Sequence, residues 1–180
     1  FDTLLFRPFS SPSDLFMLVG ERLDIMDFTQ IRLQAAEEAR QKNRLLRGNR
    51  EVTLLEIYQL VAQETGIDPQ KGADLEFSLE CELCWANPYM LEVVRILAAQ
   101  GKVLTALSDM YLPKELLTRL LSLKGYDDFD QVLVSCDYNC SKRDGGLYDL
   151  LKEQYTGRIV HIGDNQVSDI ERAREKGLDT

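Results

Sequence analysis

Short apolar runs alternate with helical segments from Gly101 to the end of the chain. The runs "KVLTALSD", "QVLVS" and "RIVHIG" precede the amphipathic patterns "PKELLTRLLSLKG", "GGLYDLLKEQY" and "VSDIERAREKG". This βαβαβα order predicts a parallel sheet with helices on both faces. Ligands of such sheets bind beyond the carboxyl ends of the strands, so the polar residues directly after each run form the candidate site.

The preceding region, residues 13–100, shows almost only helical patterns. Apolar residues recur at three- and four-residue spacing in "PSDLFMLVGERLD" and "FTQIRLQAAEEARQKNRLL". Thr53, with Glu56 three residues later, has the pattern of a capping box and predicts a helix start. Gly66 predicts the end of that helix. One further short helix is expected between Gly66 and Asn87.

The composition is that of a globular protein, and the charge argues against two classes of partner. The 180 residues are 44% hydrophobic and 28% charged, which is enough apolar material for a sizeable core. The formal net charge of −9 disfavours nucleic acid and anionic membranes, because both attract a surplus of Lys and Arg. Without an apolar run of about 20 residues or an export signal, a cytoplasmic location is expected. The missing initiator Met and the helix ending at Gly177 favour a fragment.

The four cysteines form two pairs, Cys81 with Cys84 and Cys136 with Cys140. Two such pairs would supply the four thiolates of a structural zinc site. However, the first pair lies in a helical pattern and the second follows an apolar run, so buried packing thiols are the preferred interpretation. A core of this size does not need a disulfide framework.

The segment "HIGDNQVSDI" carries two acids near a helix start. Asp164 ends an apolar run, and Asp169 lies five residues later in the next helical pattern, so both carboxylates can point to one place. Two hard oxygen ligands, completed by water and a substrate phosphate, make a reasonable Mg²⁺ site. Helix capping by Asp164 or Ser168 is the alternative. Capping would explain one of these residues but not the second acid.

Two further polar groups follow apolar runs. The Ser108 hydroxyl and the next backbone N–H, that of Asp109, can hold a phosphoryl oxygen, although Ser108 could equally cap a helix near Pro113. Lys142 could neutralise a phosphoryl group or an aspartyl-phosphate, although a loop lysine is usually solvated. The one histidine, His161, lies inside an apolar run and is expected to pack in the core rather than to catalyse.

The order of these residues resembles the four-motif pattern of the haloacid dehalogenase (HAD) superfamily of hydrolases. "FDTLLFRPF", "SDMYLP", "SK" and "GDNQVSD" together look especially like predicted bacterial hydrolases that are fused or adjacent to glycosyltransferases. The resemblance implies a Rossmann-like, doubly wound parallel sheet over residues 1–9 and 96–180, with an inserted all-helical cap over residues 10–95. It also implies a small phosphorylated substrate and a fused or associated glycosyltransferase as a candidate partner.

The resemblance assigns roles to individual residues. Ser108 matches the hydroxyl that binds the phosphoryl group, together with the backbone of Asp109, and Lys142 matches the cation of the third motif. Asp164 and Asp169 match the acids that hold Mg²⁺. The metal would also take the backbone carbonyl of Phe1.

The first motif departs from the family pattern. The family nucleophile is an Asp four residues before the motif's Thr; if Thr3 is that residue, the nucleophile lies two residues before Phe1. Superfamily phosphatases usually place their general acid and base, a second Asp, two residues after the nucleophile. That position is Phe1 here, and Asp2 stands one residue later. Either Asp2 reaches in as the catalytic acid, or the leaving group departs without one, as an acyl phosphate could.

The resulting hypothesis is a magnesium-dependent phosphatase-type hydrolase that forms an aspartyl-phosphate on an upstream nucleophile. An aromatic residue at the Phe1 position also resembles the dehalogenating branch, but a haloacid carboxylate would gain little from a Mg²⁺ site. The alternative is a catalytically weak or inactive module that regulates an attached glycosyltransferase or surface-polysaccharide enzyme. A signalling receiver domain is disfavoured, because receivers carry their acidic pair near the start of the chain.

Overall fold

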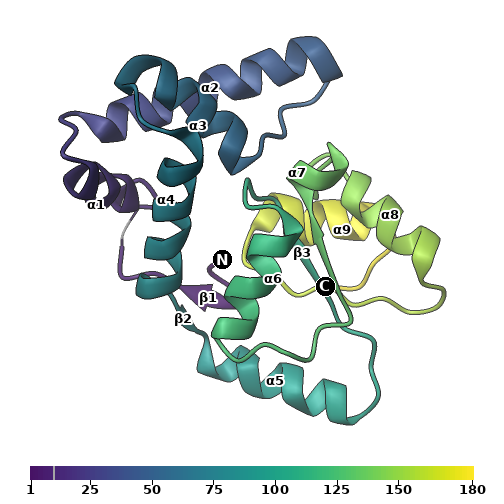
Figure 1. The fold of residues 1–180 in the computed structure, drawn as a ribbon. Helices are drawn as coiled ribbons and strands as arrows, with labels where there is room; N and C mark the ends of the chain where they lie inside the picture. The colour runs from purple at the N-terminus through teal and green to yellow at the C-terminus, as the bar shows by residue number, and fades with distance from the viewer. Residues whose placement is uncertain (10) are drawn as a thin grey trace. The chain divides into compact units, whose positions relative to one another are not determined.

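The computed structural model describes residues 1–9 and 11–180 and divides the chain into two compact units. One unit is Phe1–Phe6 with Trp85–Thr180, and the other is Arg7–Cys84. The second unit is therefore inserted in sequence between two parts of the first (Figure 1). The ranges expected from sequence place both junctions later in the chain. The assignment of the units as hydrolase core and cap stays a prediction.

The regular secondary structure of the described residues in the inserted unit is entirely helical. Its helices are α1 (Asp14–Leu23), α2 (Phe28–Arg47), α3 (Leu54–Thr65) and α4 (Pro69–Leu83).

The boundaries of α3 confirm the predicted helix start at Thr53 and the predicted helix end at Gly66. The Thr53 hydroxyl accepts from the Glu56 N–H, and the Glu56 side chain accepts from the Thr53 N–H, which is a complete capping box. Gly66 follows α3 in the left-handed conformation. The expected short helix after Gly66 is wrong in length, because α4 spans 15 residues. Asp68 caps its start by accepting from the Lys71 N–H.

A buried ion pair lies in the core of the inserted unit. Arg32 of α2 donates from Nε and Nη2 to the two carboxylate oxygens of Glu76 of α4, both over 2.8 Å. The Tyr58 hydroxyl of α3 donates to the same carboxylate over 2.9 Å. The Arg32 and Glu76 side chains are 1% and 0% exposed. Hydrogen bonds to both carboxylate oxygens offset the cost of removing these charges from water, and they tie three helices together.

The first unit contains a short parallel sheet. Strand β3 (Thr105–Ser108) pairs in parallel with β4 (Gln131–Val134), and Ser108 lies opposite Val134. Helix α6 (Lys114–Leu123) joins the two strands and contacts β4. The carboxyl ends of both strands therefore meet at one edge, as the sequence predicts.

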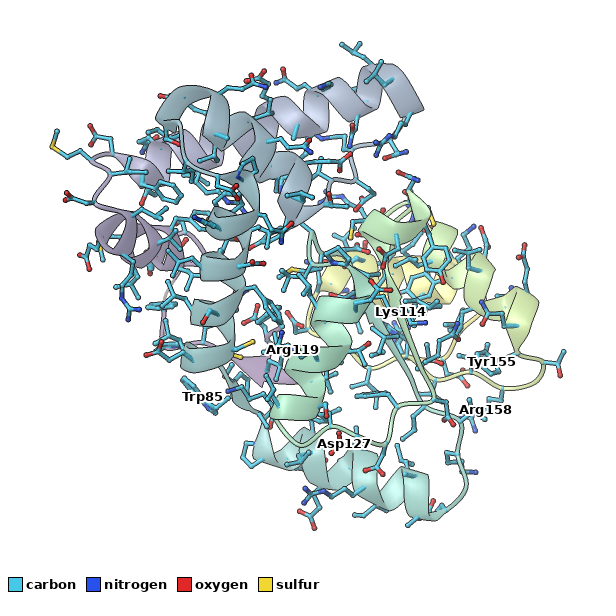
Figure 2. The ribbon with its side chains drawn as sticks, in the orientation of Figure 1. Trp85, Lys114, Arg119, Asp127, Tyr155 and Arg158 are labelled. Atoms are coloured by element: carbon cyan, nitrogen blue, oxygen red, sulfur yellow. The ribbon has the colours of Figure 1, made fainter. Side chains whose placement is uncertain are left out.

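A second pairing lies where the chain passes between the units. Strand β1 (Leu5–Phe6) pairs antiparallel with β2 (Trp85–Ala86), which is followed by α5 (Pro88–Ala99). Trp85, labelled in Figure 2, packs edge-on against Phe6 with ring centroids 6.4 Å apart. Both strands belong to the first unit, so this pairing joins the segment at which the chain leaves that unit to the segment at which it returns.

The third predicted strand, "RIVHIG", is only partly formed. In the described residues it makes a single parallel bridge, between Val160 and Asp179. The backbone supports this bridge with bonds from His161 N to Asp179 O and from Asp179 N to Ile159 O. Val160 and Ile162 stay 55% and 52% exposed, because no other described strand pairs with this segment. The parallel sheet of the described residues thus has two strands rather than the expected three.

Helices complete the first unit and confirm the expected Rossmann-like α/β class with an inserted helical unit. They are α7 (Ser135–Tyr138), α8 (Gly146–Gln154), the π-helix η1 (Gln166–Glu171) and α9 (Arg172–Glu175). Leu133 of β4 packs with Leu147 and Leu151 of α8 and with Ala173 of α9. Among the described residues, no helix is both long and apolar enough to cross a bilayer.

Candidate active site

Asp109 links the end of β3 to the loop that carries Lys142. Its carboxylate accepts from the Lys142 N–H over 2.7 Å and from the Arg143 N–H over 3.3 Å. Loss of solvent around this carboxylate raises the pKa of Asp109, and the two N–H groups offset part of that rise. The side chain therefore connects the end of β3 to the backbone of the loop at Lys142 and Arg143. The predicted use of its backbone N–H for phosphate stays a prediction.

Ser108, the last residue of β3, is half-buried and lies close to the same edge. Its hydroxyl has no hydrogen-bond partner in residues 1–9 and 11–180, so it can bind an added oxygen. The alternative that Ser108 caps the next helix is wrong, because α6 begins at Lys114 and the Lys114 N–H donates to Asp137 Oδ2. Figure 2 labels Lys114 at this helix start.

Lys142 is held at its backbone and at its ammonium group. Asp109 holds the backbone N–H, and the Lys142 Nζ donates to Asp169 Oδ1 over 2.5 Å. The Lys142 and Asp169 side chains are 13% and 3% exposed. An ammonium group fixed in this way, at the carboxyl edge of a parallel sheet, can neutralise a phosphoryl group without first being reoriented.

The Asp169 carboxylate accepts three hydrogen bonds. Oδ1 takes Lys142 Nζ and, over 3.1 Å, His161 Nε2; Oδ2 takes the Asn165 N–H over 3.0 Å. Burial opposes ionisation, but the hydrogen bonds from His161 and Lys142 outweigh it and hold the pKa of Asp169 well below its usual range. The group is therefore a carboxylate at neutral pH.

Gly163 makes room for Asp169. A Cβ atom on Gly163 would lie 2.4 Å from both Cγ and Oδ2 of Asp169, which is too close for any side chain. Asn165 explains the rest of the turn, since its Oδ1 accepts from the N–H groups of Val167 and Ser168 at the start of η1. The alternative that Asp164 or Ser168 caps this helix is therefore wrong.

Asp164 is exposed and contacts the start of the chain. The Thr3 hydroxyl donates to Asp164 Oδ1 over 2.5 Å, and the Thr3 N–H donates to the Phe1 carbonyl over 2.8 Å. Asp2 lies between them in a left-handed conformation with φ of 60°. The Asp2 side chain makes no hydrogen bond or ion pair to a described residue, so its predicted role as catalytic acid stays a prediction.

His161 does more than pack in the core. Its ring lies edge-on to the Tyr148 ring with centroids 5.2 Å apart, as a packing role requires, but its Nε2 also reaches Asp169. One signal was present in the sequence. In an extended segment His161 shares a face with Ile159, which packs against the buried cluster, so a polar atom on that face needs a partner.

The residues predicted to hold Mg²⁺ fit the ion unequally. Asp164 has a second oxygen without a described partner, and the Phe1 carbonyl accepts from the Thr3 N–H. Both oxygens of Asp169, by contrast, are occupied by protein donors. The described residues contain no group of three or more His, Cys, Asp or Glu side chains that could hold a metal. Mg²⁺ often binds through one or two carboxylates with water and phosphate, so Asp164 suits that chemistry.

The cysteines do not contribute to this site. Cys84 and Cys136 are buried, Cys81 and Cys140 are half-buried, and no disulfide joins them in the part of the chain that the structure describes. The interpretation as packing thiols agrees with this burial, and the described residues offer no thiolate cluster for zinc.

Comparison with known proteins places the fold. No protein-family model and no curated protein matches the sequence. Solved structures do match. L-2-haloacid dehalogenase from Xanthobacter autotrophicus is 19% identical, with a TM-score of 0.63 over 99% of this chain and 72% of that one. 2-Haloacid dehalogenase from Pseudomonas syringae pv. tomato is 18% identical, with a TM-score of 0.67 over 99% and 80%.

A third match is the HAD-hydrolase YfnB from Bacillus subtilis, whose structure was determined bound to magnesium. It is 18% identical, with a TM-score of 0.64 over 100% of this chain and 83% of that one. At these identities the likeness is one of fold. The chain therefore has the fold of haloacid dehalogenase-like structures, as the motif order implied.

Proposed function

We propose that the protein is a magnesium-dependent phosphatase-type hydrolase that acts on a small phosphorylated metabolite through an aspartyl-phosphate. The observation that carries the proposal is a pair of contacts, Lys142 with Asp169 and Thr3 with Asp164. They bring together residues from distant parts of the chain, and the Asn165–Asp169 hydrogen bond connects them. Phosphoryl transfer uses a cation that is held in place and an exposed carboxylate that can bind a metal, and here the exposed Asp164 directly precedes Asn165, which contacts the partner of Lys142.

In the proposed reaction, a carboxylate two residues before Phe1 attacks phosphorus and the bond to the leaving group breaks. Water then hydrolyses the aspartyl-phosphate. Lys142 would neutralise the phosphoryl oxygens throughout, and the Ser108 hydroxyl would donate to one of them. Asp2 would give a proton to the leaving group and later accept one from water, if its side chain reaches the site.

Asp164 would hold Mg²⁺ with the Phe1 carbonyl, and Asp169, which the sequence also assigns to the metal, would act chiefly through Lys142. When bound, the ion supplies charge stabilisation to the phosphoryl oxygens. Thr3 would orient the Asp164 carboxylate through its hydroxyl. The inserted helical unit would select the substrate, as the resemblance implies for a cap.

The proposal is tested with protein from the complete reading frame, including the codons before Phe1. Hydrolysis of p-nitrophenyl phosphate is measured with excess Mg²⁺ and after chelation. We expect metal-dependent turnover that falls at least about 100-fold in Lys142→Met. The control Lys102→Met, at an exposed position, keeps full activity. Turnover that survives Lys142→Met, or preference for a 2-haloacid over the phosphate ester, overturns the proposal.

The codons before Phe1 separate this proposal from the alternative of a regulatory module. An Asp two residues before Phe1 supports catalysis, and Asn, Ser or Gly there contradicts it. In the second case an inactive module attached to a glycosyltransferase or a surface-polysaccharide enzyme becomes the better account. A cytoplasmic location and an associated glycosyltransferase remain part of the proposal and rest on the sequence alone.

A further inference from the structure

His161 contacts the acid that holds Lys142. Its Nε2 lies 3.1 Å from Asp169 Oδ1, the same oxygen that accepts from Lys142 Nζ over 2.5 Å. The His161 side chain is 11% exposed, so water competes little for this contact. The imidazole and the ammonium group thus meet at one carboxylate oxygen.

The chemistry of the contact fixes the histidine tautomer. An ionised carboxylate only accepts hydrogen bonds, so the imidazole must donate, and Nε2 must carry the hydrogen. The second ring nitrogen does not have to be protonated for this. A neutral imidazole in the Nε2–H form is therefore sufficient.

Tyr148 holds both partners in place. Its ring packs edge-on against His161 with centroids 5.2 Å apart. Its hydroxyl donates to the Ser168 carbonyl, one residue before Asp169, over 2.8 Å. Tyr148 is 0% exposed and belongs to α8, so the imidazole and the start of η1 share one rigid support.

We propose that His161 is a positioning residue, which orients the Asp169 carboxylate and through it the Lys142 ammonium group. The catalytic importance of this role rests on the proposed function, whereas the contact between His161 and Asp169 does not depend on it. The Asn165 N–H fixes only Oδ2, so loss of the His161 donor leaves Lys142 as the one remaining partner of Oδ1 among the described residues. A flexible lysine cannot by itself fix the plane of that carboxylate. Replacing a residue that orients a functional side chain through a hydrogen bond typically lowers activity about 10- to 100-fold.

Two variants separate positioning from packing. His161→Phe keeps an aromatic ring against Tyr148 and removes the donor, whereas His161→Gln keeps a side-chain N–H donor. In the full-length enzyme we expect His161→Phe to lower kcat about 10-fold or more with little change in KM. His161→Gln recovers part of that loss. Arg158 lies in the same segment as His161 and forms an exposed pair with Asp179. Arg158→Gln breaks that pair and is the control for structural changes of the segment that do not involve Asp169.

A readout without turnover tests the contact in the 180-residue chain. His161 is its only histidine, so the imidazole ¹⁵N signals are unambiguous. We expect Nε2 to carry a hydrogen, the ¹⁵N signal of Nε2 to shift in Asp169→Asn, and Lys142 Nζ to be more mobile in His161→Phe than in His161→Gln. An Nδ1–H tautomer, or equal effects of both His161 variants on Lys142, overturns the inference. If these signals appear but the full-length enzyme has no phosphatase activity, the proposed function fails and the positioning contact stands.

Discussion

Thr3 donates its hydroxyl hydrogen to Asp164 Oδ1 over 2.5 Å, although 161 positions separate the two residues in the chain. The other polar groups of Thr3 are also bonded: its N–H donates to the Phe1 carbonyl, and its carbonyl accepts from Asn87 Nδ2. A residue held at three points has little freedom to move. Thr3 therefore fixes the orientation of Asp164, an exposed acid of the site.

Replacing Thr3 tests this orienting contact. Thr3→Val keeps the shape and the branched Cβ but removes the donor, whereas Thr3→Ser keeps a hydroxyl. Because the contact is exposed, we expect Thr3→Val to lower the free energy of unfolding by about 1 kcal/mol or less. Under the proposed function, Thr3→Val should also raise the Mg²⁺ concentration needed for half-maximal rate. Thr3→Ser should lie close to the parent, and equal behaviour of the two variants would contradict the contact's role.

Asp169 should matter for stability as well as for activity. Asp169→Asn removes the charge that pairs with Lys142 in a nearly enclosed place, so we expect a loss of about 3 kcal/mol in unfolding free energy by urea titration. The matched control is Glu175→Gln, which breaks the exposed Arg172–Glu175 pair and should cost less than about 1 kcal/mol. Similar losses in the two variants would show that the Lys142–Asp169 pair is effectively solvated.

Sequence periodicity predicted the elements whose own residues determine them. β3, α6, β4 and α8 follow from local patterns, and Thr53 with Glu56 announces the start of α3. The gathering of Lys142 and Asp169 at one edge was also expected, because parallel strands place their carboxyl ends together. The sequence predicted a strand for "RIVHIG", but the segment forms only one bridge. Its outcome could not be predicted locally, because a strand needs pairing partners as well as suitable residues of its own.

Contacts that need three-dimensional placement were missed. The Asp109 carboxylate binds two backbone N–H groups 33 and 34 positions away, and no local pattern encodes that. The His161 contact to Asp169 was missed for a different reason. An apolar run usually buries a histidine without a functional partner, and only the fold shows that this one faces an acid. The space that Gly163 leaves for Asp169 was missed as well, because it depends on where the Asp169 side chain lies in the fold.

The buried Arg32–Glu76 pair offers a test of the inserted unit. Glu76→Ala leaves the Arg32 charge 1% exposed without its carboxylate, and we expect a loss of about 3–5 kcal/mol in unfolding free energy. The double variant Arg32→Leu/Glu76→Leu removes both charges and should recover much of that loss. Glu37→Gln, in the exposed pair with Arg50, is the control and should leave the unfolding free energy close to that of the parent. If the double variant is no more stable than Glu76→Ala, the ion pair stabilises the unit in a way that apolar side chains cannot replace.

The capping box of α3 should make stability depend on pH. Partial burial of Glu56 would raise its pKa, but the Thr53 N–H and Arg47 outweigh this and hold it below the ordinary value of 4.5. A depressed folded-state pKa stabilises the protein above pH 4.5, and that stabilisation is lost as the pH falls through the folded value. Glu56→Gln keeps an acceptor for Thr53 without the charge. Urea titrations near pH 7 and pH 3 should therefore differ less in Glu56→Gln than in the parent.

Gly163→Ala should damage the site through a steric clash alone, since the backbone conformation of Gly163 is open to other residues. The added Cβ would meet Asp169 Cγ and Oδ2 at 2.4 Å, so the carboxylate must move away from at least one of its three donors. We expect a loss of stability of about 1–3 kcal/mol and a shifted His161 imidazole signal, and under the proposed function also a lower kcat. Gly20→Ala is the matched control, because its Cβ would meet the Phe28 Cβ at 2.6 Å in the inserted unit. Gly20→Ala should lower the stability by a similar amount and leave the His161 signal unchanged. A shift of equal size in both variants would mean that the signal reports general destabilisation rather than the position of Asp169.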